Sequence, residues 1–228
     1  MFINNRLKSE LQMDETTLNI KIALDIILQG SAPIIIELGC GDKKEAFLDD
    51  GRIGIDRVDL AHVDIVADLE KGLSFLSDNS VDEIHARSLF EHINNFDLLL
   101  KEILRVLKDD GCCRLMVPHF SNPYYYSDPT HVRFFGLYSF YYYCHEKRQL
   151  SRKVPTFYTE SRLEITSLKL RFRSSFKGRK WWKKLHEKIF NLSPSLQEFY
   201  EENLCYLFPC YGIAIEFRPD RSVDRSQR

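Results

Sequence analysis

The stretch "PIIIELGCG", residues 33–41, indicates the class of fold. Pro33 opens a run of three isoleucines that leads into two glycines, which is the pattern of a buried strand followed by a tight turn. Four more strand-like runs follow: "RIGID" (52–56), "VDIVADL" (63–69), "VDEIHA" (81–86) and "CCRLMVP" (112–118). Between the last two, residues 96–108 carry apolar residues at helical spacing. Strands that alternate with helices at this spacing predict a parallel sheet with crossover connections.

The segments on either side extend this core. Residues 15–29 carry apolar residues at helical spacing and stop before a glycine, so we expect an N-terminal helix there. Residues 163–173 and 211–219 alternate like strands, and a basic helical stretch separates them, which predicts an antiparallel pair. We therefore expect one domain over residues 1–228, with a core at about 33–118 and an aromatic lid and antiparallel strands at about 119–219.

The composition is that of an ordinary globular protein. Hydrophobic residues make up 44% of the chain, charged residues 29%, and the formal net charge is −1. No global charge therefore favours nucleic acid, and a partner of that kind would need a local basic patch. The sequence shows neither a secretion signal pattern nor a membrane-length apolar run, and its six cysteines form no C-x-x-C pair. We expect a cytoplasmic protein with reduced thiols.

The glycine turn at the end of the first strand favours a ligand site, because open α/β sheets bind ligands at the carboxyl ends of their strands. The dinucleotide fingerprint G-x-G-x-x-G fails, since Lys44 occupies the sixth position. Asp56 ends the second strand 17 residues after Gly39, where a carboxylate can accept both hydroxyls of a ribose. The alternative interpretation is a plain glycine turn and a surface aspartate.

Several motifs, in this order, carry a family resemblance. They are "ELGCG" (37–41), Asp56, "ADL" (67–69), "FLSDNSVDEIHARSLFEHI" (75–93), "LLKEILRVLKDDG" (99–111) and "DPTHVRFF" (128–135). The pattern resembles the class I S-adenosylmethionine-dependent methyltransferases and, more narrowly, their small bacterial type 11 branch. The resemblance implies a Rossmann-like α/β fold, with a mostly parallel seven-stranded sheet, an antiparallel final strand and helices on both faces. It also implies S-adenosylmethionine as the cofactor.

The resemblance implies a role for each matching position. Glu37, Gly39 and Gly41 would form the turn around the methionine part of the cofactor. Asp56 would hold the ribose, Asp68 and Leu69 would meet the adenine, and Ser88 and Leu89 would border the sulfonium. The pair Lys43–Lys44 departs from the small residues usual after these glycines.

The stretch "SNPY" (121–124) is similar to the Asn-Pro-Pro-Tyr signature with which some methyltransferases hold an amino group. That signature follows the fourth strand, whereas "SNPY" follows the fifth and lacks the second proline. We interpret the similarity as coincidental.

The same loop offers candidate catalytic residues. A hydroxyl acceptor must lose a proton, and His131 and His119 have near-neutral reference pKa values suited to accepting it. Asp128 lies three residues before His131 and is placed to orient its ring. Alternatively, Asp128 and Pro129 start a helix and His131 lies in its first turn. His119, Asp128 and His131 also suit several metals, but their spacing does not require one, and no metal is predicted. His92, in "FEHI", is interpreted as packing near the cofactor.

Residues 169–188 hold nine Lys or Arg against one acid, Glu187. Trp181, Trp182, Leu185 and Ile189 share one face of the helix expected there. The simpler interpretation is a helix that covers the sheet edge, with Trp181 or Trp182 packed inward and Lys183 and Lys184 in solvent. A basic amphipathic helix over residues 177–190 also suits an anionic membrane surface.

The predicted function is methyl transfer from S-adenosylmethionine to a small molecule, as the resemblance implies. The expected acceptor is a hydroxyl of a sugar or similar metabolite. The resemblance implies this, because members of this branch often look like enzymes that accompany surface-polysaccharide biosynthesis. The alternatives are a non-catalytic scaffold that binds S-adenosylmethionine and an RNA-directed methyltransferase that uses the basic segment. No nucleic acid partner is expected.

Overall fold

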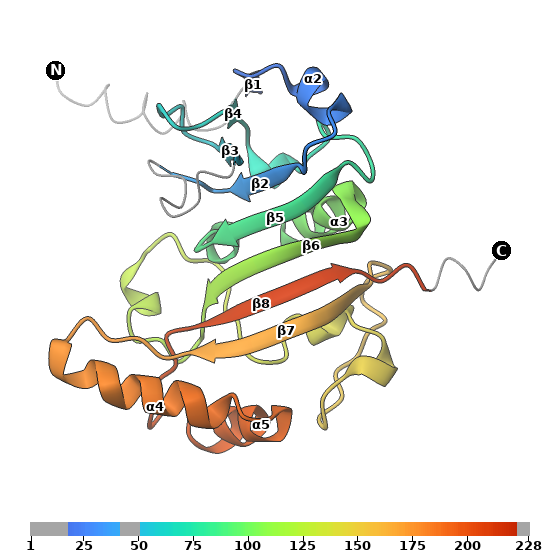
Figure 1. Ribbon diagram of the computed structural model, residues 1–228. Coiled ribbons are helices and arrows are strands. Elements are labelled where there is room, and N and C mark those ends of the chain that lie inside the picture. Colours follow the sequence, from blue (N-terminus) through green and yellow to red (C-terminus); the bar gives the residue numbers. More distant parts are fainter. Residues whose placement is uncertain (1–17, 42–50, 223–228) are drawn as a thin grey trace, which may run out of the picture.

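One eight-stranded sheet organises the computed structural model, which describes residues 18–41 and 51–222 (Figure 1). Its strands in chain order are β1 (Asn19–Ile20), β2 (Ile35–Leu38), β3 (Ile53–Asp56), β4 (Ile65–Val66), β5 (Val81–Arg87), β6 (Leu107–Pro118), β7 (Leu163–Arg171) and β8 (Gly212–Pro219). They lie side by side in the order β1-β4-β3-β2-β5-β6-β8-β7. Strands β4, β3, β2, β5 and β6 run parallel, whereas β8 is antiparallel to both of its neighbours. This confirms the predicted Rossmann-like sheet, and the short edge strand β1 brings the number of strands from seven to eight.

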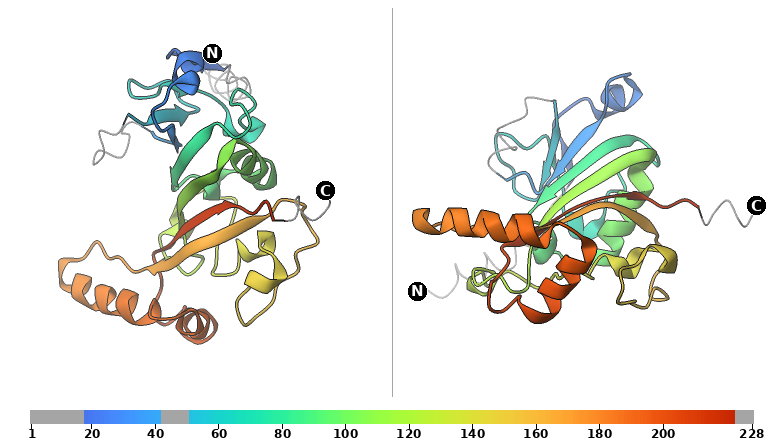
Figure 2. Two further views of the ribbon diagram at one scale, coloured as in Figure 1. Left: turned by 45° about the vertical axis from the view of Figure 1, so that its right-hand side comes forward. Right: turned by 60° about the horizontal axis from the view of Figure 1, so that its bottom comes forward.

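Four α-helices are present in the described part of the chain: α2 (Leu24–Gln29), α3 (Phe96–Val106), α4 (Lys180–Phe190) and α5 (Pro194–Asn203). Helix α3 crosses one face of the sheet behind β5 and β6 (Figure 1). Helices α4 and α5 connect β7 to β8 and lie beyond the β7 edge, as the two turned views of Figure 2 also show. Across these described ranges, no helix is long and apolar enough to span a bilayer.

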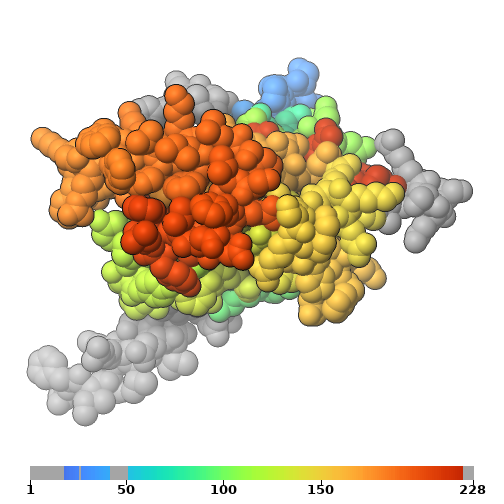
Figure 3. All heavy atoms as spheres, turned by 90° about the horizontal axis from the view of Figure 1, so that it is seen from below, coloured from blue at the N-terminus to red at the C-terminus, as the bar shows by residue number. Residues whose placement is uncertain are grey.

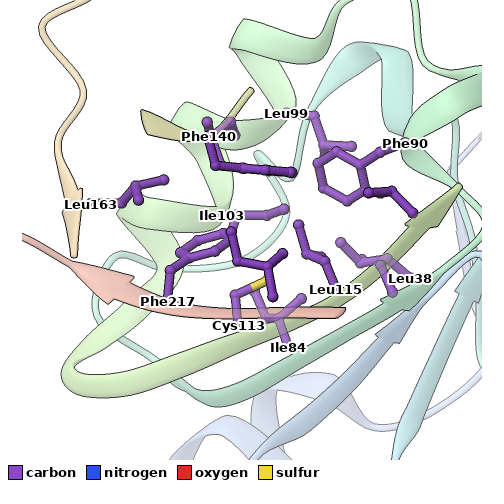
Figure 4. Packing of buried hydrophobic residues seen from close by; sticks show 14 of the residues in the cluster. Leu38, Ile84, Phe90, Leu99, Ile103, Cys113, Leu115, Phe140, Leu163 and Phe217 are labelled. Atoms are coloured by element: carbon purple, nitrogen blue, oxygen red, sulfur yellow. The ribbon is translucent and has the colours of Figure 1, made fainter. Parts of the chain in front are cut away.

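The core lies between α3 and the sheet. Leu99 and Ile103 of α3 are fully buried, as is Ile84 of β5, and they pack together with Leu115 of β6 (Figure 4). Successive strand residues point to opposite faces, so Ile84 and Leu115 meet the helix while their neighbours point away. Burial of this kind stabilises the fold strongly, since truncating a buried leucine to alanine removes about 2–5 kcal/mol.

The predicted helix over residues 15–29 is confirmed at its end but wrong over residues 18–23. Residues 15–17 lie outside the described part, residues 19–20 form β1, and only Leu24–Gln29 are helical. The cause is long-range: Asn19 and Ile20 pair in antiparallel register with β4, which local periodicity does not reveal.

Two other predicted boundaries also move. The third strand is only Ile65–Val66, because Asp68 caps the 3₁₀ turn Leu69–Lys71 by accepting a hydrogen bond from the Glu70 amide. The fifth strand begins at Leu107, directly after α3, and not at residue 112 as predicted. The register between β5 and β6 shifts near Val81, which accommodates these extra residues.

Helix α4 does not pack as predicted. Trp181 is 66% exposed and Trp182 is 44% exposed, whereas Lys183 is half-buried and donates a hydrogen bond to the Pro209 carbonyl oxygen at 2.7 Å. The buried side chains are His186 and Phe190, one turn apart near the end of the helix. The helix is therefore anchored through its last turns, and the tryptophan pair lies ahead of that anchor.

Candidate functional site

A cavity of about 420 Å³, here the first cavity, opens at the carboxyl ends of the parallel strands. It lies where the turns after β2, β3, β4 and β5 meet, as expected for an open α/β sheet. Six of the eight residues assigned to the cofactor line it: Gly39, Asp56, Asp68, Leu69, Ser88 and Leu89.

The glycine turn fixes the Asp56 carboxylate at this cavity. Gly39 and Gly41 have positive φ values of 68° and 61°, and a Cβ on Gly39 would lie 3.0 Å from Leu89 Cδ1. The Gly41 amide donates to Asp56 Oδ2 at 2.9 Å, and the Val58 amide donates to Oδ1 at 3.0 Å. Each carboxylate oxygen keeps a further lone pair, so the group can still accept hydrogen bonds from a ligand.

Asp68 and Leu69 form the next wall of the first cavity, and the neighbouring Glu70 was missed by the sequence analysis. Glu70 accepts hydrogen bonds from the backbone amides of Asn94 and Asn95, each at 2.7 Å. Burial raises the pKa of Glu70, but these bonds outweigh it and hold the pKa below its usual value. The charged carboxylate therefore fastens the 3₁₀ turn to the loop before α3.

The structure separates Glu37 from the other cofactor candidates. Its side chain is buried, lies 3.9 Å from a guanidinium nitrogen of Arg52, and lines a smaller cavity with His85 and Arg114. Glu37 thus supports the strand end rather than lining the first cavity. The departure at Lys43–Lys44 falls outside the described residues.

A second cavity of about 400 Å³ adjoins the first, and Ser88 and His92 line both. Its other walls include Arg87, Glu91, Met116, Asn122, Tyr124, Tyr125, Asp128, His131 and Tyr211. Ser88 has a positive φ of 51°, an uncommon value for a residue with a side chain. Such backbone strain of about 1–3 kcal/mol persists where the surroundings enforce it, and here it occurs at the junction of the two cavities.

His131 lines the second cavity, as a catalytic role would require. Its Nδ1 lies 2.8 Å from the Tyr125 carbonyl oxygen, which can only accept a hydrogen bond, so the proton is on Nδ1 and Nε2 keeps its lone pair. The ring packs between Tyr125 and His92, with centroids 4.5 and 4.7 Å away. Asp128 Oδ2 lies 3.7 Å from His131 Nε2.

The alternative helix start at Asp128 does not hold. Asp128 Oδ1 accepts hydrogen bonds from the amide and hydroxyl of Thr130, at 2.9 and 2.6 Å, but residues 129–134 form no helix. These bonds hold the pKa of Asp128 below its usual value. The motif is a side-chain-stabilised turn that positions His131 on the wall of the second cavity and Thr130 on the wall of the first.

His119 lies in the core and lines neither cavity. It is fully buried, with Nδ1 2.8 Å from Ser121 Oγ and Nε2 2.7 Å from Glu201 Oε2. These contacts tie the end of β6 to α5, so the predicted catalytic role of His119 has no geometric support. The metal set of His119, Asp128 and His131 is likewise not brought together, because the His119 ring is held in these core contacts.

Glu91 and His92 are the residues that sequence reasoning missed or undervalued. The 3₁₀ turn Phe90–His92 directs Phe90 into the core and presents the next two side chains to the second cavity. Glu91 is only 2% exposed, and burial raises its pKa to about 7. His92 Nδ1 lies 2.9 Å from Thr130 Oγ1. The available signal was an acid–histidine pair directly after the fourth predicted strand.

Asn122, in "SNPY", lines the second cavity and not the first. Its amide nitrogen donates to the Tyr211 carbonyl oxygen at 2.8 Å, and its side-chain oxygen accepts from the Tyr124 amide at 3.0 Å. Both polar atoms thus hold the loop itself.

Comparisons with known proteins agree with the resemblance. Residues 36–115 match the type 11 methyltransferase family model (Methyltransf_11), which is described as "Methyltransferase domain". The fold is similar to a SAM dependent methyltransferase from Archaeoglobus fulgidus (16% identity, 93% of this chain and 92% of that chain, TM-score 0.46). It is also similar to the YcgJ protein from Bacillus subtilis (14%, 86% and 98%, 0.49) and to a putative methyltransferase from Bacillus halodurans (16%, 87% and 99%, 0.49). No curated protein gave a significant match.

Proposed function

We propose that this chain is a class I S-adenosylmethionine-dependent methyltransferase of type 11, whose family model matches residues 36–115, and that it methylates a hydroxyl of a small acceptor, a sugar or a similar metabolite. The observation that carries the proposal is the pair of adjoining cavities that share Ser88 and His92. One cavity suits the cofactor and the other an acceptor. Both have volumes typical of small-molecule sites.

The residues of the first cavity fit the cofactor. A carboxylate held by two backbone amides suits the ribose hydroxyls, and the space above Gly39 is one that a Cβ would narrow. Asp68 and Leu69 offer a polar and an apolar contact for the adenine. When bound, S-adenosylmethionine supplies a methyl group already activated on a sulfonium, so the chain itself has to orient the acceptor, exclude water and remove a proton.

The walls of the second cavity favour a polyhydroxylated acceptor. Tyr124 and Tyr211 line it with aromatic rings that can pack on the C–H surface of a sugar, and Arg87 and Asp128 offer polar atoms for its hydroxyls. A sugar of the kind used in surface polysaccharides is therefore the acceptor class that we propose.

Proton removal is assigned to the cluster of Glu91, His92 and His131, here the junction cluster. All three line the second cavity, and His92 also lines the first. An acceptor oxygen positioned for transfer must lie near this junction. A hydroxyl proton can therefore leave toward the cluster.

The test measures S-adenosylhomocysteine formation with a panel of free and nucleotide-linked sugars, and cofactor binding by calorimetry. We expect cofactor binding and turnover with at least one sugar. Cofactor binding without turnover on hydroxyl or amine acceptors would favour the scaffold alternative. Turnover that requires RNA and falls steeply with salt would favour the RNA-directed alternative.

A further inference from the structure

The junction cluster has the composition and spacing of a metal site. Glu91, His92 and His131 each offer one ligand atom, and these atoms lie within 4.8 Å of one another. Two imidazoles and one carboxylate form a donor set that suits several divalent first-row metals. The Glu91 side chain also carries a buried oxygen, Oε2, that has no hydrogen-bond partner. A buried carboxylate oxygen without a partner is costly unless something occupies the space it faces.

Neighbouring hydrogen bonds engage Nδ1 and leave Nε2 without a hydrogen bond on both histidines, with Asp128 Oδ2 3.7 Å from Nε2 of His131. The Thr130 hydroxyl donates to Asp128 Oδ1, so it accepts from His92 Nδ1. The Tyr125 carbonyl oxygen accepts from His131 Nδ1. Each ring thus holds its proton on Nδ1 and keeps a lone pair on Nε2. Histidines that bind metals are almost always oriented by a hydrogen bond of this kind.

We propose that Glu91, His92 and His131 bind a divalent transition metal such as Zn²⁺ or Mn²⁺. Three protein ligands leave coordination positions open, as in catalytic metal sites, and all three residues line the second cavity. The binding itself does not depend on the proposed function, but its chemical role rests on it. An acceptor hydroxyl on the cation becomes more acidic and loses its proton to water, so with metal bound the cluster promotes proton removal through the cation instead of accepting the proton itself. Its oxygen then bonds the methyl carbon as the carbon–sulfur bond breaks, and sulfur keeps the electron pair.

The test begins with the full chain stripped by a chelator and then titrated with Zn²⁺, Mn²⁺ and Co²⁺. We expect one equivalent to bind by calorimetry, and Co²⁺ to give the visible absorption of a low-symmetry site. His92→Ala and His131→Ala should each weaken binding by more than about 100-fold, and Thr130→Val by about 10–100-fold through loss of orientation. His62→Ala is the matched control, because His62 is exposed and lines neither cavity.

The outcomes separate this inference from the proposed function. Absence of binding, or binding that both histidine variants retain, overturns the metal site. Sugar methylation that persists in chelator overturns its chemical role and leaves the proposed function standing. Metal binding by a protein that methylates no hydroxyl supports the site and removes the acceptor assignment. The histidine variants decide the question even if Glu91→Gln does not fold.

A second, independent feature is the outer surface of α4, visible with α5 in Figure 3. Trp181, Trp182, Leu185 and Ile189 are all exposed on this helix, and Leu192, two residues after its end, is 69% exposed. Lys180, Lys184 and Lys188 are exposed along the same helix, and its single acid, Glu187, is paired with Arg171 at 3.0 Å. Exposed aromatic and aliphatic side chains rimmed by lysines are the combination that binds anionic lipid surfaces.

We infer that the α4 surface contacts an anionic bilayer peripherally. Sedimentation with phosphatidylcholine vesicles, with and without phosphatidylserine, tests this. We expect binding only to the anionic vesicles, about fivefold weaker for each lysine removed and lost in the Trp181→Ser/Trp182→Ser double variant. Phe157→Ser is the control, since Phe157 is an exposed aromatic on another segment. Equal binding to both vesicles, no binding, or a stable dimer in light scattering overturns the inference.

Discussion

The two cavities differ in how they are built. The first is made mainly by the turns after the parallel strands, where backbone amides at Gly41 and Val58 hold Asp56, and only Thr130 and Val132 of the later loop complete its wall. The second is made by an irregular loop, in which the Tyr125 hydroxyl donates to the Arg133 carbonyl oxygen at 2.8 Å and Asn122 reaches the backbone at Tyr211. The proposed cofactor site thus belongs mainly to the fold, whereas the proposed acceptor site depends on this particular loop.

His131→Ala breaks this comparison most directly, because it removes a ring from the second cavity alone. We expect turnover to fall about 10²–10⁴-fold, the usual contribution of a positioned group in proton removal, while cofactor affinity stays nearly unchanged. Steady-state kinetics and calorimetry with S-adenosylhomocysteine measure the two effects. His62→Ala should change neither, and a comparable loss of cofactor affinity in His131→Ala would contradict the division between the cavities.

Asp56→Ala is the converse change, confined to the first cavity. Loss of hydrogen bonds to a charged carboxylate should weaken S-adenosylhomocysteine binding by about 1.5–3 kcal/mol, or roughly 10–150-fold. Calorimetry provides the measurement, and Asp110→Ala, at an exposed position, is the control. An unchanged affinity would remove Asp56 from the cofactor site.

This contrast also explains which parts the sequence could predict. The strands, their parallel arrangement and most of the first cavity depend on local patterns: a β-branched run, a glycine turn, an acid at a strand end. The junction cluster depends on residues 128–131 folding back onto Glu91 and His92, a contact across about forty positions that no local period encodes. The pairing of β1 with β4 and the outward tryptophans of α4 were missed for the same reason.

Glu102→Gln tests the stability of the part of the fold that carries the first cavity. Glu102 accepts two hydrogen bonds from Arg105 and one from the Leu73 amide at 3.1 Å. Hydrogen bonding to Arg105 holds the pKa of Glu102 below its usual value. The stabilisation is therefore present above the unfolded-state pKa of about 4.3 and is lost as the pH falls through the folded-state value.

We expect Glu102→Gln to lower the free energy of unfolding by about 1–3 kcal/mol at pH 7, because a charged hydrogen-bond network is broken. Urea unfolding at several pH values measures this. The difference between wild type and variant should shrink below about pH 4. A difference that is constant across pH would show that shape rather than charge is responsible.

Asn122→Ala should have the smallest effect on the chemistry, although its residue lines the second cavity. Its two side-chain hydrogen bonds go to backbone atoms of Tyr211 and Tyr124, so their loss should destabilise the loop by about 1–2 kcal/mol. Cofactor affinity should stay unchanged, because Asn122 does not line the first cavity. Calorimetry measures the cofactor affinity, and turnover at saturating acceptor measures the effect on the chemistry.

A fall in turnover beyond about a thousandfold, roughly 4 kcal/mol of barrier, would mean that the amide acts on the reacting groups. In that case "SNPY" would have the function of the signature it resembles, reached from the fifth parallel strand instead of the fourth.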